Sequence, residues 1–262
     1  MRFAVYQTSQ IGGRKYNQDR VAFAYTDEAV LLVLADGMGG HSHGEIAAQI
    51  TIQTFMTLFE EMKEVQISDP ESFLRESTKK CHEAIIDFAE LNRLEGSPGT
   101  TCVAALVQNG KVTWAHAGDS RFYLLRDRKV IGVTRDHSVV QQWADWGLIS
   151  KADMKTHPDR NKITNCLGGV EDMFFVEVSP PALIQRGDVV LLCSDGFWSP
   201  LSDDEIAEGL AEGEMSKSIG QLAELALSRD RERADNTTAV AIRLGEDQEE
   251  HKTDIPVCMS LD

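Results

Sequence analysis

The sequence predicts an α+β fold in which antiparallel sheets are covered on the outside by pairs of helices. Short apolar runs typical of strands follow one another between residues 101 and 134, where turn residues separate them at hairpin spacing. Helical periodicity occurs in two consecutive segments before this stretch and in two further segments after it. Because strand and helix do not alternate one by one, the pattern disfavours a parallel sheet.

The N-terminal third begins with strands and then changes to helices. The expected strands are at residues 3–8, 20–25 and 29–35, and a helix follows over residues 44–64. Asp69 and Pro70 resemble the N-cap and first position of a second helix. Three- and four-residue spacing predicts its buried face as Leu74, Ser77, Cys81, Ala84, Phe88 and Leu91.

The middle of the chain is expected to form a β-meander and then a small helical lobe. Asn109-Gly110 suits the positive φ angles of a two-residue hairpin turn. The strands of the meander are predicted at residues 102–107, 112–117, 122–125 and 130–133. The lobe follows Asp136 and extends to about residue 158, with a break at Gly147 and a capping box at Ser150 and Asp153.

The last part of the chain returns to core-forming sequence. The expected elements are a strand at 189–193, a helix capped by Ser202 and Glu205, a helix at 216–229 and a strand at 238–244. After Gly245 the chain is charged and lacks periodicity, so we expect residues 246–262 to be a disordered acidic tail.

Composition excludes several classes of function. With 42 acidic against 26 basic residues the formal charge is -16, and no Lys/Arg cluster could follow a nucleic-acid backbone. No apolar stretch approaches the ~20 residues that span a bilayer. Residues 1–6 lack a signal-peptide core, so we expect a cytoplasmic protein without membrane insertion. Five cysteines without a CxxC pair indicate neither a disulfide framework nor a zinc site.

Two apolar runs end near the same dipeptide, Asp-Gly. The pairs are Asp36-Gly37 after residues 31–35 and Asp195-Gly196 after residues 189–194. Asp-Gly alone is an ordinary turn signal, and that is one interpretation of each pair. The other is that a carboxylate at the end of a buried strand is held rigidly at the rim of a sheet, where two such acids can share a metal ion.

Asp119 and Asp235 have similar settings, since each adjoins a predicted strand end. Together with Asp36 and Asp195 they offer oxygen ligands without His or Cys, the donor type that Mg²⁺ and Mn²⁺ prefer. Two such ions ~3.5 to 4 Å apart can activate a bridging water and clamp a phosphoryl group. The four acids therefore favour hydrolysis of a phosphate ester. A soluble, solvated surface is the other explanation of the chain's acidity.

Seven motifs resemble, in order, those of the bacterial metal-dependent protein phosphatases (PPM, the protein phosphatase 2C family). They are RKYNQD at 14–19, ADGMGGH at 35–41, GTT at 99–101, GDSR at 118–121, DHS at 136–138, SDGFW at 194–198 and DNTT at 235–238. The resemblance implies a four-layer α/β/β/α sandwich of two antiparallel sheets flanked by helix pairs. It also implies a catalytic domain at residues 1–245, with a flap at about 138–167.

The resemblance implies roles for individual residues. Asp36 would bridge two Mn²⁺ or Mg²⁺ ions, the Gly37 carbonyl would bind one, and Asp195 and Asp235 would hold the other. Asp119 with Asp195 would favour a third, weaker site.

Around this centre, Asp19 would orient a metal-bound water and Arg14 would bind phosphate, because a guanidinium can grip two phosphate oxygens at once. A surface ion pair is the alternative for Arg14. In the flap, Trp143 and Trp146 are expected to cover a small local core, and His157 and Arg160 are candidates for substrate recognition.

Two positions depart from the family pattern. Gln18 stands where many relatives have Glu, although its amide can still accept a hydrogen bond. Met38 stands where animal members place a histidine thought to protonate the leaving alcohol. His41 and His43 are candidates for that role or for loop hydrogen bonds, and an acidic metal-bound water is a further alternative. His116, within a strand, is expected to be structural.

The expected function is that of a cytoplasmic, monomeric phosphatase acting on phosphoserine and phosphothreonine proteins. A hydroxide bridging the two metal ions would attack phosphorus directly, without a phosphoenzyme. A Ser/Thr kinase or its substrates are the expected partners. The alternatives are a catalytically silent regulatory relative, which would have lost metal ligands, and a hydrolase of small phosphate metabolites.

Overall fold

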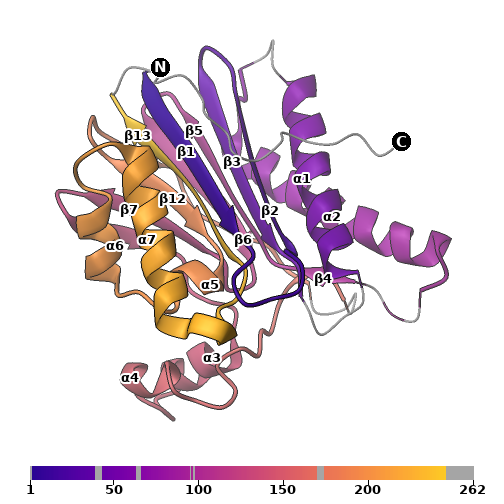
Figure 1. Cartoon of the computed structure of the whole chain (residues 1–262). Helices are drawn as coiled ribbons and strands as arrows, with labels where there is room; N and C mark the ends of the chain where they lie inside the picture. The colour runs from indigo at the N-terminus through magenta and orange to yellow at the C-terminus, as the bar shows by residue number, and fades with distance from the viewer. Residues whose placement is uncertain are drawn as a thin grey trace.

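The central strands of both sheets are buried on both faces, because a core lies on each side of each sheet. The computed structural model describes residues 2–38, 43–62, 66–94, 96, 98–169 and 174–245; within them two antiparallel sheets face each other and helices cover their outer faces (Figure 1). Along β3 (Ala29–Asp36), Leu32 and Leu34 join the core between the sheets, while Leu31 and Val33 join the core beneath the helices. The expected four-layer α/β/β/α fold is confirmed.

In the described residues one sheet has five strands and the other has six. The first has the order β1 (Phe3–Gln10), β13 (Thr237–Leu244), β12 (Val189–Cys193), β7 (Arg121–Arg126), β8 (Lys129–Val133). The second has the order β10 (Glu177–Val178), β6 (Lys111–Ala117), β5 (Cys102–Gln108), β3, β2 (Asp19–Tyr25), with β11 (Ala182–Leu183) also beside β6. A separate pair comprises β4 (Gly99–Thr100) and β9 (Leu167–Gly168). The longer strands match the sequence pattern, whereas the two-residue strands are too short to show a period.

The chain changes sheets between β6 and β7, so the expected continuous meander is wrong. Asn109 and Gly110 do form the predicted turn between β5 and β6, with φ angles of 53° and 69°. β7 and β8, however, belong to the other sheet. The crossover passes through Gly118, which has φ of 110° and where a Cβ would lie only 2.7 Å from the Thr101 side chain. A hairpin pattern identifies consecutive strands but does not determine which sheet receives them.

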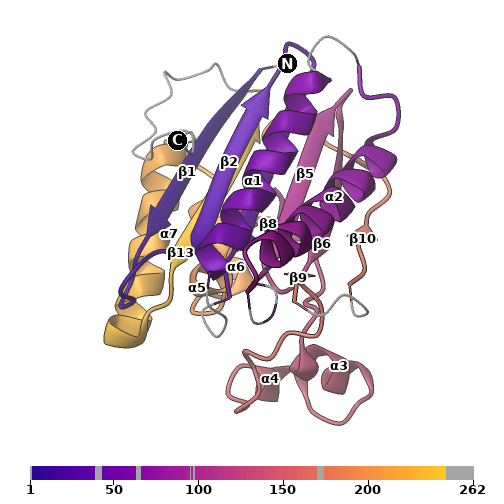
Figure 2. The ribbon, with the colours of Figure 1, turned by 90° about the vertical axis from the view of Figure 1, so that its right-hand side faces the viewer.

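Two long helices, α1 (Gly44–Glu61) and α2 (Pro70–Leu91), cover the second sheet (Figure 2). As expected, Asp69 caps α2 by accepting a hydrogen bond from the Ser72 backbone N–H. Leu74, Ser77 and Cys81 are buried as predicted. The face then continues through Ile85 and Ala89, and Leu91 is 83% exposed. The predicted continuation is wrong for Leu91, and Ala84 and Phe88 are only partly buried. The second half of α2 offers two apolar stripes, and contact with the sheet selects one of them.

Shorter helices cover the first sheet. They are α5 (Asp195–Trp198), α6 (Asp203–Gly209) and α7 (Met215–Asp230), which ends in a 3₁₀ turn (Arg231–Arg233). The predicted capping box of Ser202 and Glu205 is present at the start of α6. The single turn of α5 follows β12 directly and was not predicted, because four residues are too few to show helical periodicity.

The flap, residues 138–167, is a small lobe at one end of the sandwich (Figures 1 and 2). It contains α3 (Val139–Asp145) and α4 (Lys151–Met154), separated by Gly147 with φ of 71°, and the predicted capping box of Ser150 and Asp153 is present. Trp143 packs edge-on against His157. Trp146 is 68% exposed, so the expectation that it covers a local core is wrong.

No helix in the described part of the chain is both long enough and apolar enough to cross a bilayer. The tail predicted to be disordered, residues 246–262, lies outside the described residues.

Candidate metal centre

Four aspartates and one arginine line a cavity of about 590 Å³ beside the flap. Asp36 is the last residue of β3, and Asp195 is the first residue of α5, directly after β12. Asp119 lies in the crossover from β6 to β7, and Asp235 lies just before β13. Arg14 comes from the loop between β1 and β2. The structure therefore brings together the side chains that the sequence singled out, from both sheets, and the Gly37 backbone lies among them.

The carboxylates of this centre repel one another. Burial raises the pKa of Asp36 well above its usual range, and the charges of Asp19 and Asp195 raise it further. Burial, followed by the charges of Asp119 and Asp235, raises the pKa of Asp195 in the same way. The pKa of Asp119 is raised to about 7, mainly by burial. Carboxylates this close remain ionised together only when nearby positive charge compensates them.

Asp19 lies next to this cluster, opposite Asp36 in the register of β2 and β3. It is 2% exposed, and among the described residues neither carboxylate oxygen meets a donor in hydrogen-bond geometry. Burial raises the pKa of Asp19 to about 6, and the nearby hydroxyls of Thr238 and Ser194, whose geometry falls short of a hydrogen bond, offset this rise only in part. Two buried acceptors without donors are unfavourable in isolation. A neighbouring cation would stabilise them.

The donor set fits hard divalent cations. The side chains and the Gly37 carbonyl offer oxygen atoms, as Mg²⁺ and Mn²⁺ require. In the described residues these carboxylates do not bring three oxygens within 4.8 Å of one another, as a compact single-ion site would. Two ions ~3.5 to 4 Å apart need a wider set of ligands. The oxygen donors that line this cavity therefore suit hard divalent cations.

Backbone hydrogen bonds fix Asp36 and Gly37. The Thr101 N–H donates to the Asp36 carbonyl at 2.8 Å, and the Asp36 N–H donates to the Thr101 hydroxyl at 3.0 Å. A Cβ at Gly37 would lie 2.4 Å from the Gly44 carbonyl oxygen. Only glycine therefore allows the end of β3 to pass this close to the start of α1, which leaves the backbone at Gly37 open to the cavity.

Asn236 connects the arginine loop, the segment between β1 and β2 that carries Arg14, to the start of β13. This role was not predicted. Its Nδ2 donates to the carbonyls of Ile11 at 2.9 Å and Tyr16 at 3.2 Å, and its Oδ1 accepts from the Gln18 N–H at 2.8 Å. The motif DNTT contains this asparagine, but its partners lie more than 200 residues away in sequence. The local pattern therefore carries no sign of them.

Arg14 belongs to the loop that Asn236 holds. Its Nη2 lies 2.5 Å from Asp235 Oδ2, and its side chain is 54% exposed. The hydrogen bond to Asp235 raises the pKa of Arg14, and the charges of Asp195 and Asp36 act in the same direction. The guanidinium therefore faces the cluster of acids while remaining accessible to a ligand. Both interpretations of Arg14, the ion pair and the phosphate contact, are compatible with this position.

Trp198 holds the loop that carries Asp119, and this role was also not predicted. Its indole Nε1 donates to the Asp119 carbonyl at 2.9 Å. The Arg121 guanidinium lies 3.4 Å above the centre of the Trp198 ring, and Arg121 makes two hydrogen bonds to Asp136, at 2.7 and 2.8 Å. The presence of Trp198 in the SDGFW motif is the sequence feature that could have indicated this role. These contacts connect the GDSR, DHS and SDGFW motifs in space.

The remaining predicted residues are placed less centrally. Gln18 lines the cavity, but its Nε2 donates to Glu45 at 3.2 Å. Met38 also lines the cavity and packs over Gly99, where a Cβ would lie 2.0 Å from the Met38 Cε. His43 is the exposed N-cap of α1 and is not among the residues that line the cavity. His41 lies outside the described residues.

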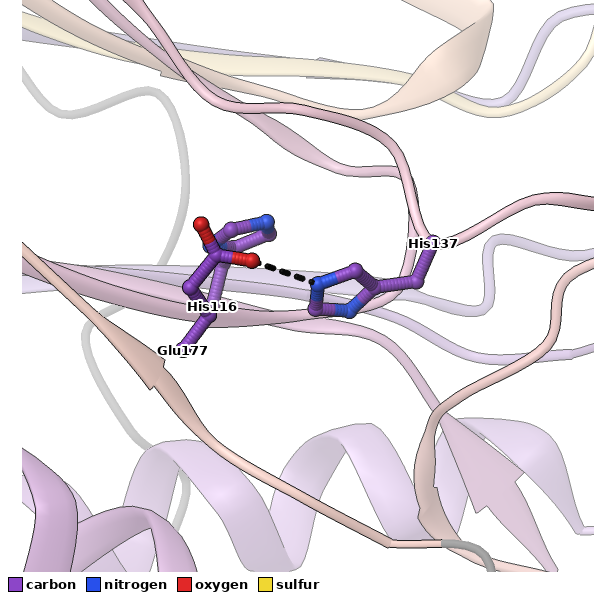
Figure 3. Close-up of side chains that lie close together, drawn as sticks. All are labelled: His116, His137 and Glu177. Carbon is purple, nitrogen blue, oxygen red and sulfur yellow. Dashed lines mark hydrogen bonds and ion pairs between the residues drawn. The ribbon is translucent and has the colours of Figure 1, made fainter. Parts of the chain in front are cut away.

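A second group of possible metal ligands lies away from this cavity (Figure 3). Three ligand-type atoms lie within 4.8 Å of one another there, and they belong to His116, His137 and Glu177. His137 Nδ1 accepts from the Gly118 N–H at 3.1 Å and from the Asn165 amide at 2.9 Å. The neutral ring therefore carries its proton on Nε2 and donates it to Glu177 at 3.2 Å. Since that nitrogen then has no free lone pair, this hydrogen bonding disfavours a metal ion. Burial, with the His116 charge, lowers the pKa of His137 to about 4, which keeps the ring neutral.

The chain is similar to known protein phosphatases. Residues 6–233 match the family model of protein phosphatase 2C. The chain is 39% identical over 204 residues, 76% of its length, to a Mycobacterium tuberculosis protein named serine/threonine protein phosphatase PstP, and the match covers 38% of that protein. The chain thus spans less than half the length of this relative. A Listeria monocytogenes protein named serine/threonine phosphatase stp is 32% identical over 209 residues, 78% of this chain and 81% of that protein.

Solved structures show the same fold. The crystal structure of the M. tuberculosis phosphatase PstP/Ppp has a TM-score of 0.83 and 33% identity, and the match covers 94% of this chain and 100% of that one. A structure of the PstP catalytic domain in complex with two manganese ions has a TM-score of 0.76 and 32% identity, over 92% of this chain and 97% of that one. Both matches extend over more than nine tenths of this chain. The chain therefore belongs to the protein phosphatase 2C family.

Proposed function

We propose that this chain is a serine/threonine phosphoprotein phosphatase that uses two Mn²⁺ or Mg²⁺ ions, with water as the nucleophile and no phosphoenzyme. The observation that carries the proposal is the convergence of Asp36, Asp195 and Asp235 with Arg14 around one cavity. The bound cations would supply an activated water and neutralise charge on the phosphoryl group. The names of the relatives support a protein substrate. The proposed substrates are phosphoproteins made by a Ser/Thr kinase, or the kinase itself.

Each residue of the centre has a proposed role. Asp36 and the Gly37 carbonyl would hold ions together with Asp195 and Asp235, and Asp119 would contribute to a third, weaker site. Arg14 would bind phosphate oxygens through its fork of N–H donors, as its exposed position allows. Asp19, buried beside Asp36, would orient the attacking water through its negative charge.

Two of the cysteines and the Thr101 hydroxyl are poorly placed to act as a nucleophile. Burial raises the pKa of Cys166 to about 11 and of Cys102 to about 12, and neither thiol lines the cavity. The Thr101 hydroxyl is hydrogen-bonded to Ser120 at 2.7 Å. No histidine lies among the described lining residues, and Met38 cannot donate a proton. The proton of the leaving alcohol is therefore proposed to come from water.

Hydrolysis of a phosphoserine peptide tests the proposal. With Mn²⁺ the protein should release phosphate, and chelation by EDTA should stop it. Asp195→Ala should lower kcat/KM about a thousandfold, because the stabilisation that a metal ligand supports amounts to several kcal/mol. Asp87→Ala, on the exposed face of α2, is the matched control and should have no effect. Activity that survives EDTA, or a burst of product that reveals a phosphoenzyme, would contradict the proposal.

A further inference from the structure

We propose that the groove between the flap and the first sheet binds the acidic residues that flank the phosphorylated residue of a protein substrate. The recognising cations are Lys151, Lys155 and Arg160. The groove has a volume of about 570 Å³ and is lined by these side chains together with the ends of β8 and α5. This inference rests on the proposed phosphatase function and extends it by naming a class of substrate sequence.

The groove opens directly onto the metal centre. Asp119, Asn161 and Asp195 line both the groove and the cavity that contains Arg14. A phosphorylated side chain bound at the centre would therefore place the neighbouring peptide residues at the mouth of the groove. The groove also has apolar surface from Val133, which is half-exposed, and from Met154. Such a surface can accommodate the aliphatic parts of an extended peptide.

The flap presents an excess of positive charge to the groove. Two of the flap's three acids are paired with cations, Asp145 with Arg135 and Asp159 with Lys162. The third, Asp153, accepts two hydrogen bonds from Ser150 in the capping box of α4 and keeps its charge. Among the described residues, Lys151, Lys155 and Arg160 form no such ion pair or side-chain hydrogen bond, and Lys151 acts on Asp145 only through its charge. Three cations without carboxylate partners therefore line a groove beside the active centre, in a chain whose formal charge is -16.

The acids in the groove offset these cations only in part. Asp136 is paired with Arg121 at 2.7 Å, whereas Asp203, which accepts a hydrogen bond from the neutral Tyr123 hydroxyl at 3.2 Å, keeps its charge at the start of α6. Asp119 and Asp195 lie at the end that opens onto the metal centre. The uncompensated positive charge is therefore on the flap, and a carboxylate of the substrate is the complementary group.

Three phosphoserine peptides test this inference: one with Glu residues before the phosphoserine, one with Glu residues after it, and one with Gln in all these positions. The wild-type protein with Mn²⁺ should hydrolyse at least one Glu peptide with a kcat/KM roughly five to twenty times that of the Gln peptide, since each exposed ion pair contributes a few-fold. This ratio should fall at high salt. Lys151→Glu with Lys155→Glu should reduce the ratio to about one or below.

The matched control is Lys80→Glu with Lys129→Glu, which changes net charge equally at exposed positions on α2 and at the far end of β8, and it should keep the wild-type ratio. Arg160→Gln, a milder change, should lower the ratio about two- to threefold, and it guards against misfolding of the double variant. The inference is overturned if the active wild-type protein shows no preference for Glu. It is also overturned if the flap variants keep that preference, or if they lower hydrolysis of a small aryl phosphate as much as that of the Glu peptide. Failure to hydrolyse any of the peptides would instead contradict the proposed function.

Discussion

At the scale of single residues, the centre depends on side chains that contact backbone rather than substrate. Asn236 is the clearest example, because one amide satisfies three backbone groups of the loop that carries Arg14. The aspartates could be predicted from their positions at strand ends and from the family motifs. Asn236 and Trp198 could not be assigned roles in that way, since their partners are distant in sequence and become neighbours only in the folded chain.

Asn236→Ala should lower kcat/KM about ten- to a hundredfold, because it releases the loop that positions Arg14. It should cost about 2 kcal/mol in the free energy of unfolding, since buried hydrogen bonds are lost. The rise in Tm caused by Mn²⁺ should remain, because the proposed metal ligands are untouched. Asn92→Ala, at the exposed end of α2, is the control. If Asn236→Ala abolished the Mn²⁺ effect on Tm, Asn236 would support the ions rather than the arginine loop.

At the scale of elements, the sequence correctly predicts features that depend only on residues close together in the chain. The capping boxes at Ser150 and Ser202 and the Asn109-Gly110 turn are complete within a few residues, so the sequence alone predicts them. The choice of sheet for β7 and of buried stripe for α2 depends on packing against distant strands. Short patterns do not contain that information, and these two predictions were wrong for that reason.

Gly118→Ala tests the crossover between the sheets. The left-handed φ of 110° and the 2.7 Å approach to Thr101 should together cost about 3 kcal/mol, or roughly 6 to 12 °C in Tm. Gly187→Ala has a similar φ of 90° but no atom within 4 Å of the added Cβ, so it should cost only about 1 kcal/mol. Thermal unfolding of the two variants separates backbone strain from steric overlap. Equal losses would show that the contact with Thr101 is unimportant.

At the scale of the whole molecule, the buried aspartates of the metal centre lower the free energy of unfolding of the metal-free protein. Both sheets deliver carboxylates to one cavity, and burial and mutual charge raise the pKa values of Asp36 and Asp195 well above their usual range. The surrounding cores keep these acids in place. The positions of the acids were predictable from the sequence, whereas the strength of their repulsion follows from their burial in the folded protein.

Asp195→Asn should therefore stabilise the metal-free protein while abolishing its function. In EDTA the variant should gain about 1 kcal/mol, or roughly 2 to 4 °C in Tm, because one of the mutually repelling charges is removed. In Mn²⁺ the wild-type Tm should rise more than the variant Tm, since ligands that bind only the folded state stabilise it. Differential scanning calorimetry with and without Mn²⁺ measures both effects. A variant less stable than wild type in EDTA would show that repulsion is not the dominant contribution at this position.

The pairing of β1 with β13 has a consequence for how the protein is made. Within the described residues, β1 pairs only with β13, in a register that sets Phe3 against Leu244. Since β1 is synthesised long before β13, it must wait for β13 before it can enter its sheet. Asn236 and Asp235 arrive with β13, so the loop that carries Arg14 is held in place only after β13 has been made. A nascent chain that stops before β13 would lack the assembled centre, so the proposed phosphatase activity would begin only after β13 has been translated.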